Sequence, residues 1–388
     1  MSFIAVLVVL LSTSSTSKAD PWLNAKIPPK LAVGLKNVGL NTIGDWTSCR
    51  RPARAGNEDE DLLKVLSHGW SHIVFVVCVD NYIETPCKKD CLDANLVRRK
   101  ARALREQISS ISKRYPKTAF VISLKSRLPI GGKWDFSGEI TTIVYDAFER
   151  DERIRDAYRE MWRIFSTELK PIDNETLAFN LMNEPEFHNY RGDRLSFWMS
   201  EATKIISDIR YIDEGRVIIL EGIRKSLFSK RADGGFGKRD QQRSADLLLQ
   251  PLPFSRLVYA FHHYEPQKWT HQRQEHSRPL RPEDLQNLKD DLAELVRFSS
   301  KHNVPVVLSE FGVWGLQQGK NGKVGATFSD RARYTNTVYE SLVPKQIGIT
   351  WWAMHDDNSP YIRKSDEKRE TDFERDILLF RALRLKID

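Results

Sequence analysis

Two glutamates at the carboxyl ends of apolar runs are the residues of this chain best suited to carry chemistry. Glu184 comes shortly after the run 177–182, and Glu310 comes shortly after the run 304–308. Each run has the pattern of a buried strand that delivers a carboxylate where burial stops. Because an ionised carboxylate is costly to bury without a partner, two such placements favour a catalytic pair over two separate structural ion pairs. Such a pair can supply a general acid, a general base and a nucleophile.

Alternating strands and helices must position these carboxylates. Strands are expected at residues 72–78, 118–124, 176–182, 216–220, 256–262, 304–308 and 348–353, with an earlier one near 31–43. Amphipathic helices are expected at 92–115, 151–169, 195–210, 283–302, 330–342 and 372–385. The alternation predicts a parallel sheet with right-handed crossovers.

Eight strand and helix units predict an α/β fold, a (β/α)8 TIM barrel, formed by a single domain over residues 20–388. An open doubly wound sheet is the alternative, but no glycine-rich phosphate turn follows the first predicted strand. The active site of a barrel lies at the carboxyl ends of its strands. Glu184 after the fourth strand and Glu310 after the seventh are therefore expected to meet in one cleft.

Four segments resemble the signature segments of glycoside hydrolase family 5, the cellulase family. They are LMNEP at 181–185, FHHYEP at 261–266, LSEFG at 308–312 and TWW at 350–352. They occur in that family's order, and the resemblance covers about residues 30–385. It implies a retaining barrel glycosidase in which Glu184 is the acid/base and Glu310 is the nucleophile.

The same resemblance implies substrate-binding residues around the two carboxylates. Asn183 would donate to the hydroxyl beside the reacting carbon, and His262 would contact the substrate. Tyr264 would lie close to the nucleophile, and Trp352 would stack beneath the sugar at the cleaved bond. An indole suits the apolar face of a sugar, and the hydroxyls of a sugar need convergent polar partners. The plainer alternatives are packing for Trp352 and Tyr264, a turn for Asn183 and a hydrogen-bonded core position for His262.

Two positions depart from the family pattern. Val74 stands where the family usually has an arginine that braces the nucleophile, and Lys125 stands nearest to a position that is commonly histidine. An arginine beside a carboxylate keeps that carboxylate ionised and oriented. Either another cation such as Lys125 compensates, or the chain has altered specificity or low activity.

The function implied by the resemblance is that of a hydrolase that cleaves a β-linked polysaccharide or oligosaccharide, with endo-β-1,4-glucanase activity as the default. The alternatives are a β-mannanase, a xyloglucan or anionic-exopolysaccharide hydrolase, and a weakly active carbohydrate-binding barrel. We expect a monomer without a membrane span, a nucleic-acid partner, a metal or an organic cofactor. Double displacement predicts carboxyl groups about 5 to 5.5 Å apart, against roughly 6.5 to 9.5 Å for an inverting enzyme.

Composition adds two features that the barrel does not explain. The chain of 388 residues has a net charge of +8, with a basic excess between Ile223 and Arg243. We interpret this segment as a solvated loop, with contact to an anionic glycan, surface or nucleic acid as the alternative. An apolar stretch at 3–11 and a small-residue step at 17–19 predict a signal peptide over 1–19 and a secreted or periplasmic protein.

The cysteines fit the same export hypothesis. All four, Cys49, Cys78, Cys87 and Cys91, lie in the N-terminal quarter of the sequence. Exported proteins meet conditions that favour disulfides, and no histidine has a recognised metal-ligand spacing from these cysteines. One or two disulfides are therefore expected, with the pairing open.

Overall fold

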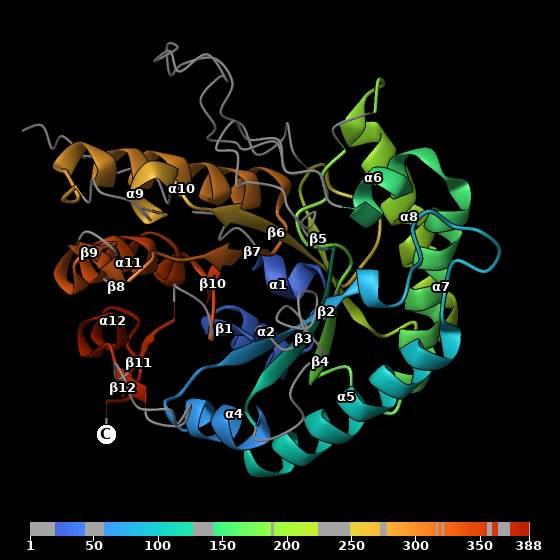
Figure 1. Cartoon of the computed structure of the whole chain (residues 1–388), viewed down its shortest axis with the longest axis horizontal. Coiled ribbons are helices and arrows are strands. Elements are labelled where there is room, and N and C mark those ends of the chain that lie inside the picture. The colour runs from blue at the N-terminus through green and yellow to red at the C-terminus, as the bar shows by residue number, and fades with distance from the viewer. Residues whose placement is uncertain are drawn as a thin grey trace, which may run out of the picture.

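A closed barrel of eight parallel strands forms the centre of the molecule (Figure 1). The computed structural model describes residues 20–42, 58–126, 143–187, 190–223, 249–271, 278–315, 317–319, 322–354, 359–363 and 373–387. The strands are β1 Val38–Thr42, β2 His72–Cys78, β3 Ala119–Lys125, β4 Leu177–Asn180, β5 Val217–Glu221, β6 Leu257–His263, β7 Val306–Phe311 and β10 Gly348–Trp351. Each strand pairs with its neighbour in chain order, and β10 pairs with β1. The predicted (β/α)8 barrel is confirmed.

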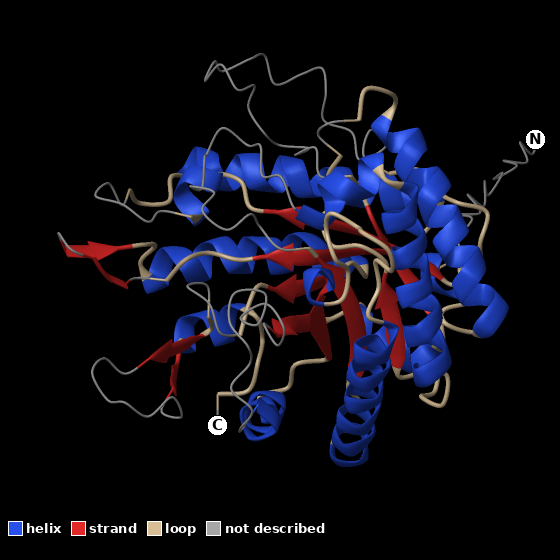
Figure 2. Ribbon diagram, turned by 45° about the vertical axis from the view of Figure 1, so that its right-hand side comes forward, coloured by secondary structure: helices blue, strands red, loops and turns tan. Residues whose placement is uncertain are grey.

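Helices surround the barrel on its outer face (Figure 2). The longer ones are α4 Glu58–Ser67, α5 Ala94–Arg114, α6 Ile143–Arg150, α7 Glu152–Leu169, α8 Arg194–Ile212, α10 Pro282–His302 and α11 Phe328–Leu342. Shorter elements are α1 Pro21–Asn24, α2 Pro29–Leu35, α9 Gln267–Thr270 and α12 Ile377–Ala382, and the 3-10 turns Val79–Asn81 and Val343–Lys345. Two small antiparallel sheets pair β8 Gln317–Gly319 with β9 Gly322–Val324, and β11 Tyr361–Arg363 with β12 Phe373–Arg375.

Acidic and hydroxyl side chains determine where several helices begin. Asp93 accepts a hydrogen bond from the backbone N–H of Leu96 at 2.9 Å, at the start of α5. Asp193 caps α8 in the same way, accepting from the N–H of Leu195 at 3.0 Å. Each cap satisfies a backbone donor that the first turn of a helix leaves unpaired. The α5 and α8 boundaries therefore follow from side chains visible in the sequence.

Alternate residues of each strand face two different cores. In β2, Val74 and Val76 belong to the cluster inside the barrel, whereas Ile73 and Phe75 belong to the cluster between the strands and the helices. All residues of β2 are buried as a result. Strands buried on both faces appear in sequence as continuous apolar runs, which is why they could be predicted.

The N-terminal end of the barrel is closed by α1 and α2. Trp22, Ile27, Leu31 and Leu35 pack in the interior cluster, and Trp22 Nε1 donates to the Gln346 carbonyl at 3.0 Å. Apolar side chains fill the barrel at the amino ends of its strands, so an active site is expected at the carboxyl ends.

Two predicted elements were wrong in detail. The strand expected near 31–43 is β1 and is shorter than that range, at Val38–Thr42, because α2 occupies the first part of the range. Pro28 and Pro29 precede and begin α2, and proline favours the first helical position. The helix expected at 372–385 is divided into β12 and α12, because Asp376 caps α12 by accepting from the Leu379 N–H at 3.0 Å. The helices α4 and α6 were not predicted.

Three sequence features lie partly or wholly outside the described residues. They are the predicted signal peptide at 1–19, the basic segment after Ile223, and Cys49. Cys87 and Cys91 form a disulfide with their Cα atoms 4.9 Å apart, which confirms that at least one disulfide forms. Within the described ranges, none of the helices combines the length and the apolar character that crossing a membrane requires.

A buried histidine ties β2 to the closed end of the barrel. His72 Nδ1 lies 3.0 Å from the Gly34 carbonyl oxygen, and Nε2 lies 2.8 Å from Thr350 Oγ1. Gly39 passes so close to the His72 ring that any side chain there would collide with it. Burial lowers the pKa of His72 to about 4, although the hydrogen bond with Gly34 opposes this shift. The imidazole is therefore neutral at pH 7, donating through Nδ1 and accepting through Nε2.

Protonation of His72 should make the fold less stable in acid. Its pKa is 6.5 in the unfolded chain and about 4 in the folded one, so the unfolded chain binds the extra proton first. The stabilisation is complete above pH 6.5 and is lost as the pH falls from 6.5 to 4. At pH 4 the free energy of unfolding should be lower by roughly 3 kcal/mol. Urea unfolding between pH 7.5 and 4 should show this loss in the wild type and not in His72→Gln. Parallel pH dependences of the two proteins would contradict the assignment.

Candidate active site

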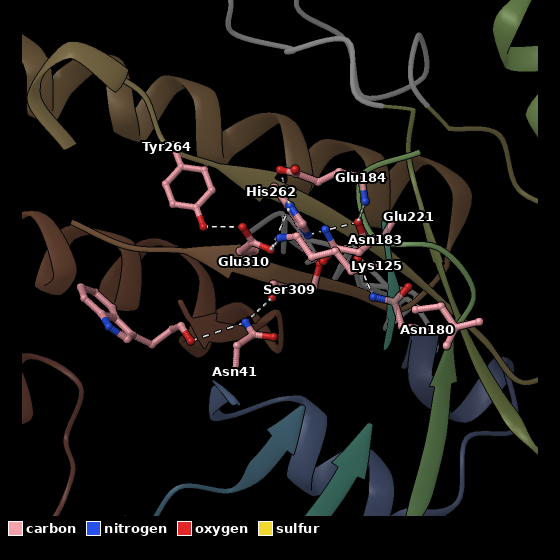
Figure 3. A network of polar contacts seen from close by, with 12 residues as sticks. Asn41, Lys125, Asn180, Asn183, Glu184, Glu221, His262, Tyr264, Ser309 and Glu310 are labelled. Carbon is pink, nitrogen blue, oxygen red and sulfur yellow. Dashed lines mark hydrogen bonds and ion pairs between the residues drawn. The ribbon is translucent and has the colours of Figure 1, made fainter. Parts of the chain in front are cut away.

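The carboxyl ends of β4, β6 and β7 bring four predicted site residues into contact (Figure 3). Tyr264 donates its hydroxyl proton to Glu310 Oε1 at 2.5 Å. His262 Nδ1 lies 3.0 Å from Glu184 Oε1 and 3.5 Å from Glu310 Oε2. His262 therefore lies between the two carboxylates that the sequence singled out.

The two carboxylates are close enough for one sugar to contact both. A carboxylate oxygen of Glu184, one of Glu310 and a ring nitrogen of His262 all lie within 4.8 Å of one another. The nearest oxygens of the two carboxylates therefore face the same small space. In the described part of the chain, this is the one group of three or more acidic, histidine or cysteine side chains whose ligand atoms approach one another this closely.

An unusual backbone conformation presents Glu184. Its φ is +49°, in the left-handed region that residues other than glycine seldom occupy. The strain is held by neighbouring contacts: the Glu184 N–H donates to Glu221 Oε2 at 2.8 Å, and the Asn183 N–H donates to the Leu124 carbonyl at 2.8 Å. Tyr145 donates to the Asn183 carbonyl at 2.7 Å. Strained residues supported in this way cluster at functional sites.

Asn183 carries a buried donor that the protein does not use. The residue is 4% exposed, and its Nδ2 has no hydrogen-bond partner among the described residues. Buried polar atoms are nearly always paired in native proteins, so such an atom indicates a missing partner. A hydroxyl of a bound ligand can fill that position.

Lys125, at the end of β3, contacts both Glu310 and Trp352, the tryptophan predicted to stack beneath the sugar. Its Nζ lies 3.8 Å from Glu310 Oε2 and 3.9 Å from the centroid of the Trp352 ring. Trp352 follows β10, is 5% exposed and belongs to the apolar cluster inside the barrel. Val74, where the family usually has arginine, lies in the same apolar cluster. Lys125 thus places a cation beside Glu310.

Burial and charge act in opposite directions on Glu310. Burial raises the pKa of Glu310, while the charges of His262 and Lys125 and the hydrogen bond from Tyr264 lower it, and Glu184 raises it. The net effect is a raised pKa. The cations limit this increase and so favour the ionised form that a nucleophile needs.

Replacing Lys125 by glutamine should shift the acidic limb of the kcat/KM profile to higher pH. The variant lacks a cation that lowers the pKa of Glu310, so this carboxyl should stay protonated to a pH about one unit higher. The acidic limb of the kcat/KM profile reflects the ionisation of an essential carboxyl group in the free enzyme. Lys125→Arg keeps the charge and should retain the original limb. An unchanged limb in Lys125→Gln would show that Lys125 does not support Glu310.

Glu221, the last residue of β5, belongs to the site and was not predicted. It is 2% exposed, and its Oε1 accepts from Asn180 Nδ2 at 2.5 Å. Its Oε2 accepts from the Glu184 N–H and lies 3.1 Å from His262 Nε2. The signal was present in the sequence, since an apolar run at 217–220 leads directly into this glutamate. The same pattern had singled out Glu184 and Glu310.

The charges around His262 favour its protonated form. Burial alone would lower the pKa of His262, but the charges of Glu221 and Glu310, the hydrogen bond with Glu184 and the close contact with Glu221 raise it well above the ordinary value. The site therefore combines three carboxylates with two basic groups, His262 and Lys125. This composition suits proton transfer and nucleophilic attack at one carbon.

Comparisons with known proteins point to one family. Residues 137–358, more than half of the chain, match the family described as Cellulase (glycosyl hydrolase family 5). Cel5A of Thermotoga maritima in complex with cellobiose shares 18% identity at a TM-score of 0.64, covering 94% of this chain and 100% of that one. The cellulose synthase subunit Z of Clostridioides difficile shares 16% identity at 0.63, covering 89% and 99%. A broad-specificity endoglucanase of Clostridium acetobutylicum shares 15% identity at 0.61, covering 91% and 97%. A search of curated proteins found no match.

Proposed function

Because the chain belongs to glycosyl hydrolase family 5 and is a β-glycoside hydrolase, we propose that it cleaves a β-1,4-glucan internally by double displacement. The observation that supports this mechanism most strongly is the pairing of Glu184 and Glu310, with oxygens within 4.8 Å of each other. The Tyr264 phenol and the Lys125 ammonium group lie beside Glu310, and the His262 imidazole is hydrogen-bonded to Glu184. The different surroundings give the two carboxyls different tasks.

In the first step Glu310 is the nucleophile and Glu184 is the acid. A carboxylate oxygen of Glu310 forms a bond to the anomeric carbon while the bond from that carbon to the leaving oxygen breaks. Glu184 gives its proton to the leaving oxygen. Tyr264 and Lys125 hold Glu310 by a hydrogen bond and a charge. The product of this step is an ester between Glu310 and the sugar.

In the second step water releases the sugar. Glu184, now ionised, takes a proton from water as the water oxygen bonds to the anomeric carbon. The bond between that carbon and Glu310 breaks, and the electron pair returns to the carboxylate. Both carboxyls regain their starting protonation, and two inversions retain the anomeric configuration.

Asn183 and Trp352 are proposed to bind the sugar at the cleaved bond. The Nδ2 group of Asn183, which has no hydrogen-bond partner among the described residues, lies one residue from Glu184 and can donate to the neighbouring hydroxyl. Trp352 offers an indole that is held beneath Lys125, next to Glu310. The apolar face of a pyranose suits such a surface.

The glycan is proposed to be a glucan, with a mannan as the second candidate. A Thermotoga Cel5A structure contains cellobiose, and another is described with a mannotriose substrate.

Export is proposed because of the apolar stretch at 3–11 and the Cys87–Cys91 disulfide, since disulfides persist in oxidising compartments. We propose a monomer as the working form.

A panel of polysaccharides tests the activity. Purified protein should cleave carboxymethylcellulose with a rapid fall in viscosity and release oligosaccharides of mixed length, whereas exo attack would release one small sugar. Faster cleavage of a β-mannan, a xyloglucan or an anionic exopolysaccharide would overturn the glucan assignment. Binding without hydrolysis across the panel would favour a carbohydrate-binding barrel.

A further inference from the structure

A third carboxylate lies next to the catalytic pair, and the two steps above do not use it. Glu221 comes from β5, between the strands that carry Glu184 and His262 (Figure 3). It touches both residues, through the Glu184 N–H at 2.8 Å and through His262 Nε2 at 3.1 Å. Burying a carboxylate costs free energy unless charge or hydrogen bonds compensate, so its place beside the acid/base requires an explanation.

The ring of His262 faces carboxylate oxygens with both nitrogens. Nδ1 is hydrogen-bonded to Glu184 Oε1 at 3.0 Å, and Nε2 lies 3.1 Å from Glu221 Oε2 in an ion-pair contact rather than an aligned hydrogen bond. A neutral imidazole has one N–H and one lone pair. A lone pair on Nε2 would face the anionic Glu221 Oε2, and a lone pair on Nδ1 would face the anionic Glu310 Oε2 at 3.5 Å, even when Glu184 carries its proton. A ring protonated on both nitrogens attracts both carboxylates.

We propose that Glu221 is a positioning residue that holds His262 as an imidazolium and thereby orients the acid/base Glu184. The inference rests on the proposed function for the roles of Glu184 and Glu310, and on contacts alone for the state of His262. With Nδ1–H donating to Glu184 Oε1, the proton of the acid is placed on Oε2. That oxygen is then the one that protonates the leaving group.

With His262 protonated, the charges of the site balance in both catalytic states only if Glu221 is present. Before attack, Glu221 and Glu310 are negative, Glu184 carries its proton, and His262 and Lys125 are positive. In the covalent intermediate Glu310 is a neutral ester and Glu184 has lost its proton, so Glu184 and Glu221 face the same two cations. Electroneutrality matters in a buried site, where unpaired charge is costly. Removing Glu221 leaves one excess positive charge in each state.

The surrounding titratable groups support this arrangement. The carboxylates that face His262 are Glu184, Glu221 and Glu310, and their charges and hydrogen bonds raise its pKa against the opposing effect of burial. Lys125 and Tyr264 contact Glu310 on its other sides. Two buried phenols near Glu221 stay neutral, because burial first and then nearby charge, including that of Glu221, raise the pKa of Tyr145 and of Tyr158 well above 10.

Two measurements on Glu221→Gln and the wild type test the inference. The first is 15N NMR of protein labelled in histidine, with His262 assigned by its replacement. The wild type should show both His262 ring nitrogens protonated at pH 7.5, and Glu221→Gln should show a neutral ring. The second is the pH profile of kcat. Its alkaline limb, where the coupled Glu184 and His262 pair loses its catalytic proton, should move down by about one pH unit or more in the variant.

Glu201→Gln is the matched control, since Glu201 is also buried and paired with a cation, Lys204, but lies on α8. It should match the wild type in both measurements. A neutral His262 in the wild type at pH 7.5 overturns the inference, and it can be observed even if Glu221→Gln does not fold. An unmoved alkaline limb in a folded Glu221→Gln also overturns it. Failure of every glycan to be cleaved would reject the proposed function and leave the NMR result to decide the state of His262.

Discussion

Glu310→Ala should lower kcat on a β-1,4-glucan by at least about 10⁴-fold, because the first step then has no group to attack the anomeric carbon. The loss should appear in kcat and kcat/KM alike, since the missing bond forms only in the transition state. Steady-state kinetics with a soluble glucan or an aryl β-cellobioside measure the effect. Circular dichroism should show an intact fold.

Chemical rescue distinguishes a lost nucleophile from a damaged site. Azide can enter the space that the Glu310 carboxylate leaves beside Lys125 and Tyr264. It should attack the anomeric carbon of an activated β-glycoside from the same face and give an α-glycosyl azide. Glu201→Gln, on α8, should keep wild-type kinetics and form no azide adduct. A Glu310→Ala protein that retains substantial glucanase activity would exclude Glu310 as the nucleophile.

Glu184→Gln should produce the second largest effect, and its size should depend on the leaving group. A positioned general acid contributes about 10² to 10⁴ in rate. Cleavage of a glucan, whose leaving alcohol needs a proton, should slow by about that factor. A dinitrophenyl β-cellobioside leaves without a proton, so its first step should be little affected. The second step should become rate-limiting and the glycosyl-enzyme should accumulate, because no base activates water.

Pre-steady-state measurement of dinitrophenol release tests this prediction. Glu184→Gln should show a burst followed by a slow steady state, and the wild type should show no comparable burst. The alkaline limb of the kcat profile should also disappear, since the group that loses its proton there is absent. Equal losses on both substrates would mean that Glu184 serves the structure of the site rather than proton transfer.

Most of the barrel could be predicted because its strands are buried on both faces. Runs such as 73–78 in β2 are apolar throughout, and helices such as α7 show apolar residues at helical spacing. The errors arose where a local signal overrode the general pattern. Prolines begin α2 inside an apolar range, and Asp376 caps α12 inside a range that had appeared to be one helix.

The catalytic pair could be predicted from a polar residue that ends an apolar run, but the contacts between site residues could not. Glu221 shares that pattern, but the family resemblance assigns roles to only two carboxylates. Its importance depends on β5 lying between β4 and β6, which brings it against both Glu184 and His262. The approach of Lys125 to Glu310 likewise depends on side-chain positions across the barrel, which sequence spacing does not specify.

Covalent trapping tests the central claim most directly. A 2-deoxy-2-fluoro β-cellobioside with a dinitrophenyl leaving group should react with the wild type, since the fluorine slows the second step more than the activated first step. Mass spectrometry of the intact protein and of its peptides should then find one added disaccharide, attached to Glu310. Attachment to another residue, or hydrolysis of natural glucan with inverted configuration and no adduct, would contradict double displacement through Glu310.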